Sequence, residues 1–109
     1  MAESLKVLAQ SSPAATTLTD VYTVPAATSA TISTIAICNR SATATTFRLS
    51  VAIAGAVDAI QQYVYYDQLI DGNSTFGITI GMTLGAADKI RVYAGAATIS
   101  VNVFGVEVN

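Results

Sequence analysis

Apolar and polar residues alternate with a period of two in three segments of the chain, 47–53, 76–80 and 99–103. In the clearest segment the apolar positions are Phe47, Leu49, Val51 and Ile53. Successive side chains of a strand point to opposite faces of its sheet, so this period indicates strands with one buried and one solvent-facing side. The pattern therefore predicts a half-buried strand in each segment.

Five further segments have weaker strand patterns and are separated by turn-forming residues: 4–9, 21–24, 30–39, 62–68 and 89–94. The string Asp71-Gly72-Asn73 has the composition of a hairpin turn. Beyond Val103 the apolar phase moves by one residue, and a β-bulge near Gly105 would account for that shift. The chain is expected to hold about eight short strands.

Short strands at this spacing, without helical periods between them, predict an all-β fold. We expect a single antiparallel β-sandwich of jelly-roll type over residues 1–109, with a small closed barrel as the alternative. Segment 52–61 is expected to be a long loop, with a short helix as the alternative. Segment 1–10 is either an arm that reaches a neighbouring molecule or an ordinary first strand.

Charged residues make up 11% of the 109 residues, against about 25% in ordinary domains, while hydrophobic residues make up 52%. So few charges cover the surface of a lone monomer poorly, which predicts a homo-oligomer.

The net charge of −2 gives no basic surface for binding nucleic acid. No apolar run is long enough for a membrane span, and segment 1–6 lacks a secretory pattern, so synthesis in a cytoplasm without membrane attachment is expected.

The sequence offers little catalytic chemistry, because it contains no histidine and one cysteine, Cys38. Histidine is the commonest general base and metal ligand, and a structural zinc site needs several Cys or His ligands. The aspartates lie in or beside predicted loops, where solvated turn residues are the ordinary case. We expect no catalytic, cofactor-binding or metal-binding residues, no cofactor and no enzymatic activity; a carboxylate-based enzyme is the remote alternative.

Contacts with other subunits are expected from exposed aromatic and apolar residues. Tyr63 and Tyr65 are predicted on one strand face and Tyr66 on the other, so at least one ring should meet solvent or a partner. Leu5 and Val7 are the contact candidates in segment 1–10, and loop 52–61 is a third region. Cross-strand ion pairs are expected between two arginines and two aspartates: Arg48, Arg91, Asp67 and Asp88.

Several strings of the sequence together resemble a family of small virion proteins of tailed bacteriophages. In chain order they are Tyr22-Thr23-Val24-Pro25-Ala26, Ile32-Ser33-Thr34-Ile35 running into Cys38-Asn39-Arg40, Thr46-Phe47-Arg48, Tyr65-Tyr66-Asp67 and Phe104-Gly105-Val106-Glu107. The resemblance extends from about Leu5 to Val108. Its motifs are structural rather than catalytic.

The resemblance implies a virion component, most simply a capsid decoration (cement) protein. Such a protein would sit on the outer capsid surface as a homotrimer and bridge neighbouring subunits of the major capsid protein. The alternative is a neck, tail or fibre-associated structural protein, for which a cluster of exposed tyrosines with Asp67 or Asp71 would favour glycan binding.

Overall fold

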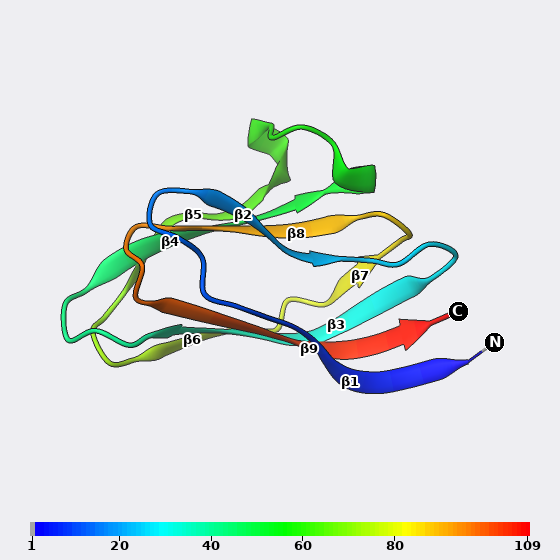
Figure 1. Cartoon of the computed structure of the whole chain (residues 1–109), viewed down its shortest axis with the longest axis horizontal. Coiled ribbons are helices and arrows are strands. Elements are labelled where there is room, and N and C mark those ends of the chain that lie inside the picture. The colour runs from blue at the N-terminus through cyan, green and yellow to red at the C-terminus, as the bar shows by residue number, and fades with distance from the viewer. Residues whose placement is uncertain (1) are drawn as a thin grey trace.

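The computed structural model describes residues 2–109, and its regular elements are nine β-strands and two single-turn 3-10 helices (Figure 1). The strands are β1 (Glu3–Ser11), β2 (Leu18–Thr23), β3 (Ser29–Asn39), β4 (Thr45–Ala52), β5 (Tyr63–Ile70), β6 (Thr75–Ile78), β7 (Met82–Leu84), β8 (Lys89–Ala94) and β9 (Ile99–Val108). The 3-10 helices are η1 (Ile53–Gly55) and η2 (Ile60–Gln62). In residues 2–109 there is no helix with the length and apolar character needed to cross a membrane.

The strands form two antiparallel sheets that pack face to face, which confirms the predicted β-sandwich (Figure 1). The first sheet has the order β1-β9-β3-β6, with β7 also paired to β3, and the second has the order β2-β8-β4-β5. Most strands that follow one another in the chain lie in different sheets, with β4–β5 and β6–β7 as the exceptions, and late strands insert between early ones. This is the strand order of a jelly roll.

The core lies between the sheets and consists of the inward residues of each alternating strand. Its fully buried members include Ile35, Ile37, Phe47, Leu49, Ile90, Val92, Ile99, Val101 and Val103. Burying each such side chain contributes about 1.5–3 kcal/mol, so the alternation seen in the sequence is the main source of the fold's stability. Phe47 also packs edge-on against Phe76, with ring centroids 5.4 Å apart.

From Glu3 onwards, segment 1–10 belongs to a first strand rather than to a free arm, and Met1 lies outside the described residues. β1 pairs with β9 from Glu3 to Ser11, and Ala2 and Asn109 exchange backbone hydrogen bonds of 2.9 and 3.0 Å. The two ends of the chain consequently lie side by side (Figure 1).

Two strand predictions need correction at their ends. The expected strand 76–80 ends at Ile78, and the unpredicted strand β7 follows; both short strands pair with β3, so the sandwich has nine strands instead of about eight. Ile53 and Ile80 continue the apolar alternation of the sequence, but both lie outside strands and are exposed.

β9 runs without a bulge of its own past Gly105. The extra residues belong to its neighbours, because the register shifts at Leu8 in β1 and at Ser33 in β3. A Cβ on Gly105 would stand 2.2 Å from the backbone oxygen of Thr31, so the glycine permits a close approach of β9 and β3. The apolar residues after Val103 therefore turn to the outer face of the sheet.

Asp71-Gly72-Asn73 forms a turn between β5 and β6, but the predicted hairpin is wrong, because β5 and β6 belong to different sheets and do not pair with each other. Asn73 has a φ of 54°, and the hydroxyl of Ser74 donates a 2.7 Å hydrogen bond to the carbonyl of Asp71. Gly72 packs on the backbone of Ala42, where a Cβ would stand 2.1 Å from the carbonyl oxygen. This residue is therefore restricted to glycine by sterics.

Candidate functional site

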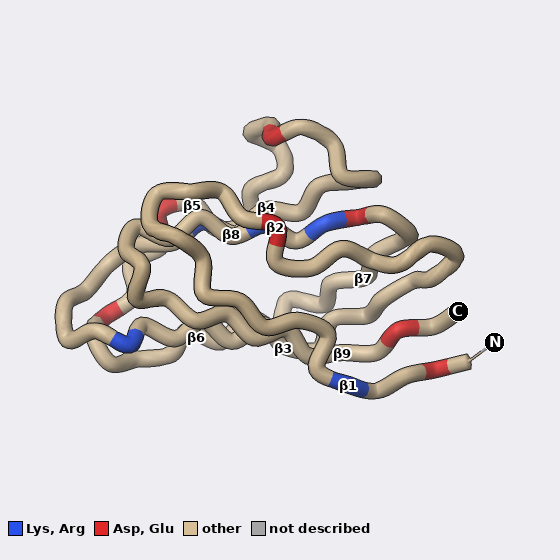
Figure 2. Tube along the Cα trace, in the orientation of Figure 1, with Lys and Arg blue, Asp and Glu red and all other residues tan. Residues whose placement is uncertain are grey.

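The predicted contact residues fall into two groups on opposite sheets. Leu5 and Val7 lie on β1 of the first sheet, and the three tyrosines lie on β5 of the second. Figure 2 shows that charged residues are sparse along the whole chain, so most of the surface around both groups is uncharged. The structure thus holds separate candidate surfaces rather than one site.

The first surface, here called the β1 surface, is the outer side of β1 and β9. Leu5 is 79% exposed and pairs with Val106, while Val7 is 49% exposed and pairs with Phe104. Phe104 is itself exposed on this side. Apolar side chains from two neighbouring strands therefore form a continuous exposed stripe. The sequence predicted only the β1 part of this stripe, because the phase change after Val103 was interpreted as a bulge.

The tyrosines of β5 do not divide between the faces as predicted. Tyr65 pairs with Leu49 and packs inward against Phe47 and Phe76, whereas Tyr63 pairs with Ser50. Since Leu49 and Ser50 are consecutive, Val64 is an extra residue that reverses the phase between the two tyrosines. Tyr63 is therefore placed on the outer face, opposite to the face of Tyr65.

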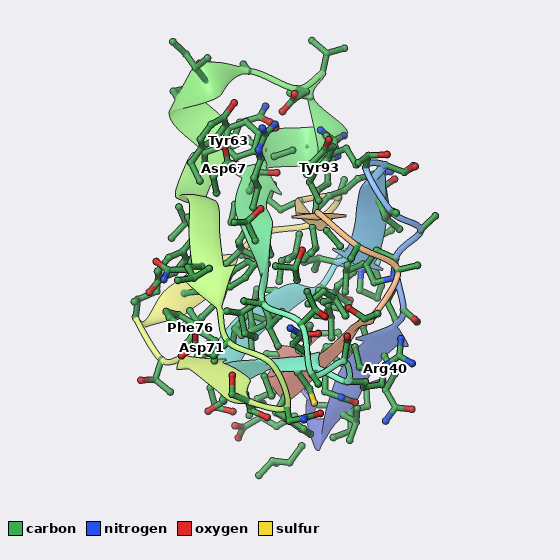
Figure 3. The ribbon with its side chains drawn as sticks, turned by 90° about the vertical axis from the view of Figure 1, so that its left-hand side faces the viewer. Arg40, Tyr63, Asp67, Asp71, Phe76 and Tyr93 are labelled. Atoms are coloured by element: carbon green, nitrogen blue, oxygen red, sulfur yellow. The ribbon has the colours of Figure 1, made fainter. Side chains whose placement is uncertain are left out.

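Tyr63 and Tyr66 meet on the outer face of the second sheet, with ring centroids 5.1 Å apart and nearly perpendicular planes. The extra residue Val64 makes this contact possible, because it places Tyr63 on the same face as Tyr66. A second bulge sets Tyr66 and Asp67 opposite Arg48, and Asp67 has a φ of 51° there. Tyr66 is 60% exposed. In Figure 3, Tyr63, Asp67 and Tyr93 lie on the side of the sandwich that carries the projecting loop.

A guanidinium group lies between two of these rings. The Cζ atom of Arg48 is 4.1 Å from the ring centroid of Tyr66 and 4.5 Å from that of Tyr93. Its Nε also donates a 2.7 Å hydrogen bond to Asp67, which confirms one predicted ion pair. The tyrosine cluster (Tyr63, Tyr66 and Tyr93 with Arg48 and Asp67) thus already satisfies much of its own stacking and charge pairing.

The other predicted ion pair is wrong in its partner. Arg91 binds Asp20 at 2.9 Å, and Lys89 binds the second oxygen of the same carboxylate at 2.8 Å. The hydrogen bond from Lys89 is the main cause of a lowered pKa of Asp20, and Arg91 adds to it. Asp88 instead accepts hydrogen bonds from the backbone N–H groups of Ala54 and Gly85, both at 2.8 Å.

The loop from residue 53 to residue 62 projects from the second sheet (Figure 1). It contains η1 and η2, so the predicted long loop is correct and its helical content is limited to two 3-10 turns. Its large apolar side chains are exposed: Ile53, Val57 and Ile60, the last by 90%. These three side chains form the second surface, here called the loop surface.

The projecting loop is connected by hydrogen bonds to the strands from which it projects. Arg91 donates hydrogen bonds to the carbonyls of Ala56, at 2.8 Å, and Gly55, at 3.3 Å. The hydroxyl of Tyr63 donates to the carboxylate of Asp58 at 3.1 Å, and burial together with this bond raises the pKa of Tyr63. A pre-ordered loop loses less conformational entropy when its apolar side chains bind a partner.

A pocket of about 200 Å³ lies beneath the loop and is lined by Val51, Ile53, Ala56, Gln61 and Gln62. None of these side chains titrates, so the lining supplies no general acid, general base or nucleophile. Within residues 2–109, no group of three or more His, Cys, Asp or Glu side chains is placed to hold a metal ion.

The residues of the string Cys38-Asn39-Arg40 have structural roles at one end of the sandwich. Asn39 is fully buried and donates to the carbonyl of Thr43 at 2.9 Å, while its side-chain oxygen accepts from the hydroxyl of Thr98 at 3.0 Å. Arg40 donates to the carbonyl of Ala97 at 3.1 Å. Cys38 is partly buried.

Comparisons with protein families, with curated proteins and with solved structures gave no match.

Proposed function

We propose that this chain is a non-enzymatic virion component of a tailed bacteriophage, a capsid decoration protein that bridges subunits of the major capsid protein. The observation that carries the proposal is the presence of two separate exposed apolar surfaces on one small rigid sandwich. The β1 surface belongs to the first sheet and the loop surface projects from the second (Figure 1). A bridging protein needs two such surfaces.

Multivalent attachment explains how modest contacts would stabilise a shell. Once one surface is bound, the other acts at a high effective concentration, so two weak contacts on a rigid body give strong attachment. A homotrimer on the outer capsid surface, as the resemblance implies, multiplies the number of contacts again. Because such a lattice covers much of each subunit, it also accounts for the 11% content of charged residues.

The proposal is tested on particles of the phage that encodes the chain, prepared with and without the protein. We expect particles that carry it to release their genome at a higher temperature. Ile60→Asp places a charge on the loop surface and should abolish this gain, because a charge cannot be buried without a partner. Ile80→Asp is the matched control, since Ile80 is an exposed isoleucine outside both surfaces. Equal release temperatures with and without the protein would contradict the proposal.

A second candidate is a neck, tail or fibre component that binds glycans, and the exposed tyrosine cluster favours it. Aromatic rings stack on sugars, and Tyr66 is largely open to solvent. The guanidinium of Arg48 occupies ring surface that a sugar would need, and Asp67 is already paired with it. Binding to a glycan array that Tyr66→Ala abolishes would favour this candidate over a decoration protein.

A further inference from the structure

β1 is the longest regular open edge of the sandwich. Among residues 2–109 it pairs with β9 alone, and residues Glu3 to Val7 do so without a register shift. The edge strands of the second sheet are interrupted, β2 by one register shift and β5 by two, and the opposite edge of the first sheet consists of the short β6 and β7. Open, regular edges are the places where a further strand can add.

The hydrogen bonds at the chain ends show which backbone groups of β1 face this edge. Ala2 and Asn109 exchange both of their hydrogen bonds, so they form a hydrogen-bonded pair of the antiparallel ladder. Hydrogen-bonded pairs occur at every second residue of the ladder, so the N–H and C=O groups of Ser4 and Lys6 also point towards β9. The N–H and C=O groups of Glu3, Leu5 and Val7 therefore point away from β9, towards the open edge.

The side chains of β1 do not block this edge. Leu5 and Val7 are exposed apolar residues on the outer side. Lys6 points to the other side, where its ammonium group binds Glu107 at 2.9 Å. Edge strands are often protected by an unpaired lysine, and here the lysine charge is already neutralised within the chain.

We propose that β1 pairs antiparallel with β1 of a second copy of this chain, about a two-fold axis at Leu5. In this register Leu5 pairs with the partner's Leu5, and Glu3 pairs with the partner's Val7 in both directions. The outward N–H and C=O groups of Glu3, Leu5 and Val7 in each copy are then hydrogen-bonded to the other copy. The exposed apolar stripe continues across the two-fold axis. The contact is isologous, so it joins copies two at a time and is distinct from the trimer contact of the proposed function.

Two alternative registers are less favourable. A shift by one residue would place the outward N–H and C=O groups of one copy opposite backbone groups of the partner that already bind β9. It would also put the exposed apolar side chains of the two copies on opposite faces of the joined sheet. A shift that pairs Leu5 with the partner's Val7 places Lys6 directly opposite the partner's Lys6, and like charges in that position are destabilising. The register centred on Leu5 instead places Lys6 opposite the partner's Ser4.

Disulfide trapping tests the contact and its register. In a Cys38→Ser background, Leu5→Cys puts two thiols on the axis with Cα atoms about 5.5 Å apart, within disulfide range. Val7→Cys is the register control, because its two copies lie four residues apart along the pair, about 13 Å. Leu69→Cys is the control for nonspecific oxidation, since Leu69 is an exposed leucine on the edge strand β5. We expect a cross-linked dimer from Leu5→Cys at least tenfold faster than from either control; equal rates would overturn the proposal.

Sedimentation of the full chain gives a second readout that does not depend on oxidation. Leu5→Pro removes one outward N–H and leaves the bonds to β9 intact, a position where edge strands accept proline. We expect the wild-type protein to form an assembly of an even number of copies across a concentration series, and Leu5→Pro to halve its mass. Leu69→Ser should keep the wild-type mass. An unchanged mass in folded Leu5→Pro, or a wild-type monomer throughout, would overturn the proposal.

Discussion

The hydroxyl of Tyr22 donates a 2.6 Å hydrogen bond to the carboxylate of Glu107, which connects β2 of one sheet to β9 of the other. Tyr22 is buried, and the second carboxylate oxygen of Glu107 binds Lys6 at 2.9 Å. Burial and the neighbouring carboxylate raise the pKa of Tyr22 well above its usual range. This polar contact lies between two sheets that are otherwise joined mainly by apolar packing.

Replacing Tyr22 by phenylalanine should destabilise the fold. The variant leaves the ring in place but removes the donor, and a hydrogen bond to a charged group contributes about 1.5–3 kcal/mol. Urea unfolding should therefore show a decrease of that size in the free energy of unfolding. Tyr66→Phe is the control and should change it by less than about 0.5 kcal/mol, because that ring lies on the surface. Equal effects of the two variants would contradict this role of Tyr22.

Stability should also fall in acid through Glu107. The hydrogen bond from Tyr22, followed by that from Lys6, lowers the pKa of Glu107 in the folded state. Because the pKa of Glu107 is lower in the folded state than in the unfolded state, its ionised form stabilises the fold above the unfolded-state pKa of about 4.3. This stabilisation is lost as the pH falls through the folded-state pKa. Melting temperatures from neutral pH to about pH 2 should decline less steeply in Glu107→Gln. Part of the decline should remain, because the pKa of Asp20 is lowered too. Parallel curves would contradict the assignment.

Arg91 should control the order of the projecting loop more than the stability of the sandwich. Arg91→Met removes the donors to Ala56 and Gly55, so amide hydrogen exchange in segment 53–62 should become faster. Global stability should change by about 1 kcal/mol or less, because the carboxylate of Asp20 is about half exposed and stays paired with Lys89. Lys89→Met is the control, since it also loses Asp20 but has no hydrogen bond to the loop. Unchanged exchange in Arg91→Met would show that the loop is held by other contacts.

Ser50 should be a site where a substitution stabilises the protein. It is fully buried on the loop side of β4, and its hydroxyl has no hydrogen-bond partner within residues 2–109. An unpaired buried hydroxyl carries a desolvation cost, so Ser50→Ala should raise the free energy of unfolding by about 1 kcal/mol. Ser100→Ala, at a partly exposed position, should have little effect. A destabilised Ser50→Ala would indicate a bound water or partner at this hydroxyl.

The sequence predicted the sandwich because alternation reports directly which residues face a core. Segments 47–53 and 99–103 have a period of two, and the corresponding strands bury Phe47, Leu49, Ile99, Val101 and Val103. β7 was missed because three residues are too few to establish a period, and its strand character depends on pairing with β3. Ile53 was wrongly placed in a strand because it continues the apolar alternation of β4, although its side chain lies exposed on the projecting loop.

The surfaces were harder to predict because they depend on register between strands far apart in the chain. The extra residue Val64 separates the faces of Tyr63 and Tyr65, and no local pattern marks it. Arg91 binds Asp20 rather than Asp88 because β2 lies beside β8 in the sheet. By contrast, Arg48 and Asp67 belong to strands that are consecutive in the chain, and that pair was predicted correctly.

The number of copies of this chain in a purified virion tests the proposed decoration role most directly. Quantitative mass spectrometry can measure it relative to the major capsid protein. A decoration protein that bridges capsid subunits should be present in amounts comparable with the shell protein. A few to a few tens of copies per particle would place the chain in the neck, tail or fibres, and its absence from the particle would contradict a virion role altogether.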